Sequence, residues 1–314
     1  MSKKLNIYLA GPRGFCAGVD RAIEMVKGAL KKYGAPVYVR HEIVHNKFVV
    51  ENLKSQGAIF IEELNEIVDK SRPVIFSAHG VPKGVPEEAL SLNLVYYDAT
   101  CPLVSKIHKE VENFDKKNLP VILIGHRNHP EVIGTMGQTD KKIYLVEKVE
   151  DIKKLPFNQN DEIAYVTQTT LSVDDTKDII KEIKLHFSNV IEPKKNDICY
   201  ATTNRQNAVK ELTDKCDIIF VVGSENSSNS NRLKEIATRA GVPSYLLDSA
   251  DDLDVKWLHN KKNIGLTAGA SAPEILVQSI INKLMGFGAI NVINSSGIEE
   301  NITFKIPKEL MAKS

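Results

Sequence analysis

Residues 94–114, LVYYDATCPLVSKIHKEVENF, contain the pattern that decides the fold. A short run rich in Val, Leu and Tyr predicts a β-strand, and a polar turn follows it. Cys101 then opens a segment whose apolar residues recur at helical spacing, namely Val104, Ile107, Val111 and Phe114. The stretch predicts a strand followed by a helix, with a cysteine at the start of the helix.

The same pattern occurs at two other places in the chain. Cys16 opens a predicted helix with apolar residues at 19, 23, 26 and 30, and Cys199 opens a weaker one with apolar residues at 208, 209 and 212. Each predicted helix is followed by a strand that ends in polar residues, RHEIVHN, IGHRNHPE or VGSENSSN. A later strand ends in a second polar turn, SAHGVP, TQTTLS or TAGASAP. We interpret this as three copies of one α/β unit.

Alternating strand-like and helix-like segments run from end to end and predict parallel sheets covered on both faces. We expect a first α/β subdomain at 1–100 with Cys16, a second at 101–198 with Cys101, and a third at 199–288 with Cys199. Residues 289–314 are expected to pack back on the core. Ligands of such sheets bind in the loops after the strands, so three facing units would line one cavity with their cysteines and polar turns.

Composition excludes several classes of protein. The 314 residues are 42% hydrophobic and 26% charged, which is typical of a soluble globular protein and not of a disordered one. The formal net charge is +1 and no basic stripe is present, so no nucleic-acid partner is expected. No apolar run is long enough to span a membrane, and no signal-peptide pattern precedes the first strand. We expect a cytoplasmic protein whose cysteines are metal ligands or nucleophiles and not disulfides.

The three repeated cysteines are candidate metal ligands. A free cysteine is most often a small buried apolar residue, but the start of a helix stabilises the thiolate, which is the form that binds metals. Three thiolates can hold a four-iron cluster with one open iron, or a zinc ion with one open position. Cys216, in DKCDIIF, has no counterpart in the other repeats, and we interpret it as structural.

Polar residues in the strand-end turns form a candidate anion site. His45, His79, His126 and His129 follow predicted strands, and Ser227, Ser228 and Asn229 stand at a predicted helix start, where free N–H groups favour anions. Ser271 and Thr169 occupy the later turns, although Ser227, Asn229 and Ser271 are equally explained as helix caps. Together they suggest a phosphorylated or diphosphorylated small molecule. Glu131 in NHPEV is either a general acid or an ordinary first-turn charge.

Eight motifs resemble one family, the 4-hydroxy-3-methylbut-2-enyl diphosphate reductases of the non-mevalonate isoprenoid pathway. They are GPRGFCAGVDRAI, SAHGV, DATCPLV, GHRNHPEVIGTMGQ, TQTTLSVDDT, DICYATTNRQ, GSENSSNSNRL and TAGASAP, in family order and over essentially the whole chain.

The resemblance implies a trefoil, a pseudo-threefold arrangement of three α/β subdomains around a [4Fe-4S] cluster with one open iron. Cys16, Cys101 and Cys199 would be its ligands, and Glu131 would supply a proton. The substrate would be bound by His45, His79, His129, Thr169, Ser227, Ser228, Asn229 and Ser271. The implied reaction removes the substrate hydroxyl as water, using two electrons and two protons, and yields isopentenyl and dimethylallyl diphosphates. A ferredoxin or flavodoxin would supply the electrons.

Two other classes of function are compatible with the residues alone. One is a zinc hydrolase with a three-cysteine site that acts on a phosphorylated substrate. The other is a non-catalytic protein that binds a phosphorylated metabolite and has structural cysteines. An iron–sulfur protein purified without air is brown, whereas the other two would be colourless.

Overall fold

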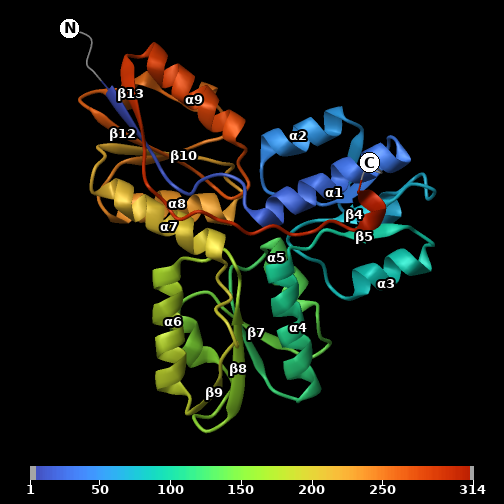
Figure 1. Ribbon diagram of the computed structural model, residues 1–314. Helices are drawn as coiled ribbons and strands as arrows, with labels where there is room; N and C mark the ends of the chain where they lie inside the picture. Colours follow the sequence, from blue (N-terminus) through green and yellow to red (C-terminus); the bar gives the residue numbers. More distant parts are fainter. Residues whose placement is uncertain (1–4, 312–314) are drawn as a thin grey trace. The chain divides into compact units, whose positions relative to one another are not determined.

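The computed structural model describes residues 5–311, in which short strands and helices alternate (Figure 1). The strands are β1 Leu5–Leu9, β2 Val37–Arg40, β3 Ala58–Ile61, β4 Val74–Phe76, β5 Tyr96–Asp98, β6 Val121–Ile124, β7 Ile143–Val146, β8 Glu162–Thr167, β9 Asn189–Ile191, β10 Ile218–Val222, β11 Ser244–Leu247, β12 Asn263–Ala268 and β13 Ala289–Asn294. The helices are α1 Ala17–Tyr33, α2 Lys47–Ser55, α3 Gly84–Ser91, α4 Pro102–Lys116, α5 Pro130–Met136, α6 Val173–His186, α7 Tyr200–Thr213, α8 Ser228–Arg239 and α9 Glu274–Gly286.

The strands form three parallel sheets. Sheet A has the order β11-β10-β12-β1-β13, sheet B the order β3-β2-β4-β5, and sheet C the order β7-β6-β8-β9. The expected α/β class with parallel sheets is confirmed.

The described chain divides into two compact units. Unit 1 comprises residues 5–19, 45–52 and 200–302 and contains sheet A. Unit 2 comprises residues 20–44, 53–199 and 303–311 and contains sheets B and C. The strand at 5–9 falls in the expected first subdomain but pairs with β12 and β13 in sheet A. A run of alternating apolar residues specifies a strand but not which sheet it joins, because parallel pairing is non-local.

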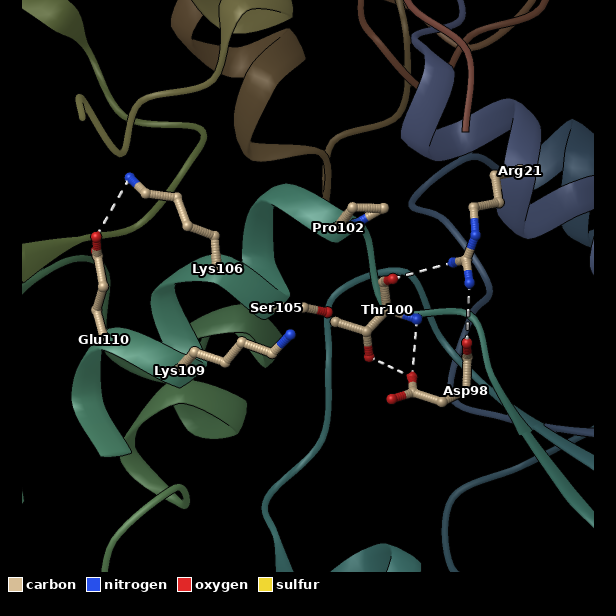
Figure 2. A pocket seen from close by; sticks show the side chains of 8 residues that line it. All are labelled: Arg21, Asp98, Thr100, Pro102, Ser105, Lys106, Lys109 and Glu110. Carbon is tan, nitrogen blue, oxygen red and sulfur yellow. Dashed lines mark hydrogen bonds and ion pairs between the residues drawn. The ribbon is translucent and has the colours of Figure 1, made fainter. Parts of the chain in front are cut away.

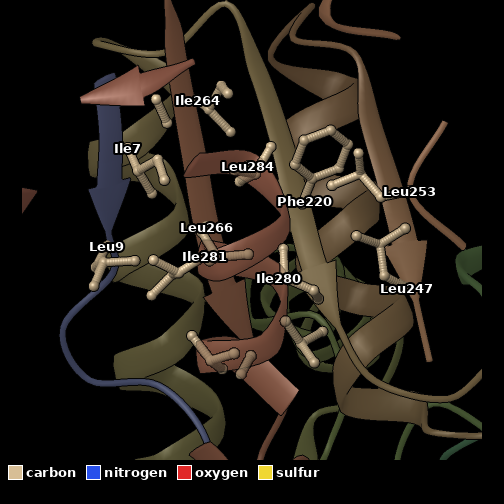
Figure 3. Close-up of a cluster of buried hydrophobic side chains, with 14 of the residues drawn as sticks. Ile7, Leu9, Phe220, Leu247, Leu253, Ile264, Leu266, Ile280, Ile281 and Leu284 are labelled. Atoms are coloured by element: carbon tan, nitrogen blue, oxygen red, sulfur yellow. The ribbon is translucent and has the colours of Figure 1, made fainter. Parts of the chain in front are cut away.

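Sheet A is covered on both faces, as a parallel sheet must be. Along β10, Ile218, Phe220 and Val222 belong to one hydrophobic cluster, whereas Ile219 and Val221 belong to another. The first cluster includes the buried side chains of α9 (Figure 3). The second includes Leu212 of α7 and Leu233 of α8, with their apolar neighbours. This two-sided core fixes the strands whose following loops carry the candidate site of unit 1.

In sheets B and C the strands are short and almost entirely apolar. All residues of β2, β4 and β6 are buried. Helix α4 packs Ile107, Val111 and Phe114 against Val121 and Leu123 of β6, which confirms the helical spacing after Cys101. None of the helices within residues 5–311 is long and apolar enough to cross a membrane.

Candidate active site

Three consecutive strands have the same order in each of the three sheets, which places a topological switch point at an equivalent position in each. In sheet B the chain runs from β2 outward to β3 and returns on the other side of β2 as β4. Sheet C repeats this with β6, β7 and β8, and sheet A with β10, β11 and β12. The loops after the two central strands separate at such a switch point and leave room for a ligand. The candidate binding residues lie in or near these loops.

The three cysteines occupy equivalent positions. Cys16, Cys101 and Cys199 follow β1, β5 and β9 respectively, and each directly precedes a helix, α1, α4 or α7. Each cysteine N–H donates to a carbonyl oxygen in the loop after the neighbouring strand. These bonds are Cys16 N to Ala270 O at 3.2 Å, Cys101 N to Ala78 O at 2.9 Å and Cys199 N to Thr169 O at 3.1 Å. The predicted equivalence of the three cysteines is confirmed.

The surroundings of Cys16 act on its thiol in opposite directions, and burial has the larger effect. Burial raises the pKa of its thiol, while the N–H groups of Val19 and Gly18 and the Arg205 guanidinium lower it. The free N–H groups of a helix start stabilise negative charge, which is the form a metal requires. Cys216 differs, since burial raises its pKa to about 12 and its side chain packs in the core beside Ile219.

The donor set of three thiolates fits an iron–sulfur cluster chemically. Cys16 belongs to unit 1, whereas Cys101 and Cys199 belong to unit 2. Among the residues from 5 to 311, no three His, Cys, Asp or Glu side chains are grouped as a metal ion would require. The ligand set stays a prediction.

In unit 1, hydrogen bonds join the loops after β10 and β12 and the His45 segment. Ser271 Oγ donates to the carbonyl oxygen of His45 at 2.8 Å, and Asn226 Nδ2 lies 3.4 Å from His45 Nδ1. Asn229 Oδ1 accepts the N–H of Ala270 at 3.0 Å. The unit therefore holds His45, Asn229 and Ser271 as one connected group.

Ser227 and Ser228 mark the start of α8. Ser227 is the N-cap, and its hydroxyl accepts the Ser230 N–H at 3.3 Å, while Ser228 is the first helical residue. The capping explanation of Ser227 is thus confirmed. It does not remove the anion-binding capacity of the remaining N–H groups at this helix start.

In unit 2, Glu131 is buried and bound to Thr169. One carboxylate oxygen accepts the Thr169 N–H at 2.6 Å and the other accepts the Thr169 hydroxyl at 2.9 Å. Burial raises the pKa of Glu131 to about 7, although both bonds from Thr169 lower it. Glu131 is therefore not an ordinary exposed first-turn charge. A carboxyl group with this pKa can hold a proton near neutral pH and release it.

Two candidate histidines of unit 2 lie together. The rings of His79 and His129 are edge-to-face with centroids 5.9 Å apart. The loop after His79 packs closely on α5, because a Cβ on Gly134 would lie 3.0 Å from the backbone of Gly80. Gln138 Nε2 also donates to the Val81 carbonyl oxygen at 2.8 Å. These contacts place His79 beside the helix that begins after His129. His126, another of the strand-end histidines, lies with His129 in the loop between β6 and α5.

A cavity of about 500 Å³ lies beside the Cys101 helix in unit 2 (Figure 2). Its walls include Thr100 and Pro102, the two sequence neighbours of Cys101. Asp98 accepts the N–H and hydroxyl of Thr100, and Arg21 donates to the Thr100 carbonyl oxygen at 3.0 Å. None of the candidate site residues lines this cavity. Asp98 acts here as the acceptor that shapes the turn before Cys101.

Arg205 is a structurally important residue near Cys16 that the sequence patterns did not predict. The side chain is fully buried on α7 and donates to the carbonyl oxygens of Gly14 and Phe15, directly before Cys16. A signal existed in the sequence, because Arg205 falls on the helix face that carries Ala201, Ala208 and Val209. A cation on an apolar helix face is buried only when it is paired.

Comparisons with known proteins show the family of the chain. The profile of the family described as LytB protein matches residues 7–285. The chain belongs to the LytB family. Curated relatives named 4-hydroxy-3-methylbut-2-enyl diphosphate reductase are 57% identical in Actinobacillus pleuropneumoniae and 56% identical in Proteus mirabilis, over 98% of this chain and 98% of each relative.

A solved structure has the same fold. The E-1-hydroxy-2-methyl-but-2-enyl-4-diphosphate reductase from Plasmodium falciparum matches with a TM-score of 0.93 and 43% identity, over 98% of this chain and 97% of that one. The resemblance found in the motifs is therefore confirmed, as is the expectation that this LytB protein is an oxidoreductase.

Proposed function

We propose that this LytB protein catalyses the reductive dehydroxylation of 4-hydroxy-3-methylbut-2-enyl diphosphate, the terminal step of non-mevalonate isoprenoid biosynthesis. The observation that carries the proposal is the 57% identity to curated reductases over 98% of both chains. The C–O bond of the substrate breaks and its oxygen leaves as water. Two electrons and two protons enter, one proton joins the leaving oxygen, and the other forms a C–H bond in isopentenyl or dimethylallyl diphosphate.

The cofactor in this proposal is a [4Fe-4S] cluster held by Cys16, Cys101 and Cys199. When bound, its open iron supplies single electrons and Lewis acidity toward the substrate hydroxyl. A ferredoxin or flavodoxin provides the electrons. The support is the equivalent place of the three cysteines, each at a helix start and each tied by its N–H to the loop after the adjacent strand.

The residues of the chain bind and orient the substrate and deliver protons. His45, Ser227, Ser228, Asn229 and Ser271 of unit 1 and His79, His129 and Thr169 of unit 2 are the proposed diphosphate and pocket residues. Histidine, hydroxyl and amide donors can hold the anionic end of the substrate and so orient its allylic carbon.

Proton delivery is assigned to Glu131. The Thr169 N–H and hydroxyl fix both of its oxygens, and burial keeps its pKa near 7, so the group is protonated in a large fraction of molecules at neutral pH. A proton placed on the leaving oxygen makes water the leaving group and lowers the barrier to C–O cleavage.

The direct test is purification without air, with analysis of iron and sulfide and turnover of the diphosphate substrate with a reduced viologen dye. We expect a brown protein with about four irons per chain that produces both isomers. A colourless zinc protein would contradict the proposal and favour a hydrolase. A metal-free protein that binds the diphosphate without turnover would favour a binding protein.

A further inference from the structure

Lys106 on α4 makes an ion pair with a buried carboxylate that is close to Cys199 in the sequence. Its Nζ lies 2.9 Å from Asp197 Oδ1 and 2.8 Å from the carbonyl oxygen of Lys195. The Asp197 side chain is 0% exposed. Lys106 therefore connects the helix that begins after Cys101 with the loop that ends at Cys199. All of these residues belong to unit 2.

The second oxygen of Asp197 continues the connection into sheet C. It accepts the N–H of Thr167 at 2.9 Å, at the end of β8. Two residues further on, the carbonyl oxygen of Thr169 accepts the Cys199 N–H, and the Thr169 N–H and hydroxyl bind Glu131. One carboxylate thus links the Cys101 helix, the Cys199 loop and the backbone that holds Glu131.

A second acidic side chain on the same helix also lies near Lys106. Glu110 Oε1 lies 3.8 Å from Lys106 Nζ, one helical turn away (Figure 2). Two carboxylates thus face one ammonium group. Without the cation, the buried Asp197 would stand near Glu110 with no compensating charge, and removing one partner of a buried ion pair is strongly destabilising.

We propose that Lys106 and Asp197 are a positioning pair. The pair fixes the positions of the Cys199 loop and of the Glu131–Thr169 contact relative to the helix that begins after Cys101. The inference rests on the proposed function, because it assigns the pair to the geometry of the cluster ligands and of the proton donor. Partners that orient metal ligands without touching the metal typically contribute about 10–100-fold in metal affinity or activity.

The test compares Lys106→Met with Lys109→Met. Lys109 is exposed on the same helix and makes no hydrogen bond or ion pair within the described chain, so it is a matched control. In Lys106→Met we expect cluster loss under a chelator to be faster by about 10-fold or more and kcat to fall by a similar factor. Lys109→Met should behave as the parent. Equal behaviour of the two variants would overturn the proposal.

Two further variants separate positioning from general damage to the fold. Lys106→Arg restores a cation and should recover kcat to within a few-fold of the parent. Lys106→Met combined with Asp197→Asn should be no worse than Lys106→Met alone, because residues that act as one pair are not additive. Full additivity, with unchanged circular dichroism, would show that the residues act separately and would contradict the proposal.

A measurement on the apoprotein makes the result independent of the proposed reaction. Alkylation rates of Cys101 and Cys199, followed by mass spectrometry, report the geometry of the loops without a cluster. We expect Lys106→Met to change the Cys199 rate by several-fold and Lys109→Met to leave it unchanged. An unchanged Cys199 rate would overturn the positioning pair. If instead the parent chain bound no iron, the proposed function would fail while the alkylation result still decided the role of the pair.

Discussion

Nη1 of the Arg205 guanidinium donates to both carboxylate oxygens of Glu300, at 3.0 and 3.1 Å. Its remaining N–H groups donate to the backbone carbonyl oxygens of Gly14 and Phe15. Arg205 therefore joins the residues before Cys16 to the segment that follows β13. The planar donor fork of arginine makes this arrangement possible, and lysine cannot reproduce it.

We expect Arg205→Met to lower the free energy of unfolding by about 3–5 kcal/mol, because it leaves Glu300 without its cation in a mostly buried position. Arg205→Lys should fall between this variant and the parent. Urea unfolding of the apoprotein measures the difference. The control is Arg127→Met, because the Arg127 side chain is 69% exposed and its ion pair with Glu147 at 3.7 Å contributes about 0–1 kcal/mol. Equal losses in the two Met variants would show that burial of Arg205 does not matter.

Most strands could be predicted because they are continuous apolar runs between polar turns. The runs at β2, β6 and β10 are buried throughout, so hydrophobicity alone marks them. The strands β9 and β13 were not predicted. Strand β9 has only three residues, of which Asn189 is exposed, and β13 exposes Ile290 and Asn291, so neither shows a buried apolar run. Such strands form through contacts with their pairing partners, which the local sequence does not contain.

The site was predictable where a residue type repeats at an equivalent position. The three cysteines are the clear example, since the structure gives each the same N–H contact to the loop after an adjacent strand. Arg205, Lys106 and Asp197 were missed because their roles depend on contacts between distant segments. Lys106 binds a residue 91 positions away. A single helical pattern shows Lys106 only as a surface charge.

His108 should make stability depend on pH. Burial lowers its pKa to about 4 in the folded chain, against the ordinary 6.5, and its Nε2 has no hydrogen-bond partner within the described residues. The unfolded chain binds a proton below about pH 6.5, whereas the folded chain does not until about pH 4. The contribution of His108 to the free energy of unfolding therefore falls as pH drops through this window, by on the order of 3 kcal/mol.

The variant His108→Leu isolates this effect, because it fills the site without a titrating group. Raised carboxyl pKa values, such as that of Glu131, act in the opposite direction, so the parent and the variant are compared at each pH. Parent and variant should differ by a constant amount above pH 6.5 and increasingly in favour of the variant below it. A constant difference from pH 7 to pH 4 would show that His108 does not carry the dependence.

The four cysteines should divide into two classes on substitution. Cys16→Ser, Cys101→Ser and Cys199→Ser should each lose most of the iron and the turnover, because serine oxygen is a poor ligand for an iron–sulfur cluster. Cys216→Ser should retain both, with a modest loss of stability from its buried position beside Ile219. Iron analysis and turnover without air measure these outcomes. Full iron content in the Cys199→Ser protein would remove that residue from the ligand set.

Glu131→Gln should separate proton delivery from binding. The amide keeps the size of the side chain and can still accept from Thr169, but it cannot deliver a proton. We expect normal iron content, near-normal substrate affinity, and turnover lower by about 10²–10⁴-fold.

The protonated carboxyl is the active form and its pKa is about 7, so kcat/KM of the parent should be level at acid pH and fall as pH rises above about 7. This fall of kcat/KM at alkaline pH, the alkaline limb of the profile, should be absent in the variant. Turnover within a few-fold of the parent, or an unchanged alkaline limb, would assign proton delivery to another group. A water chain through the substrate diphosphate would then be the better candidate than Asp98, whose carboxylate is occupied by the Thr100 N–H and hydroxyl.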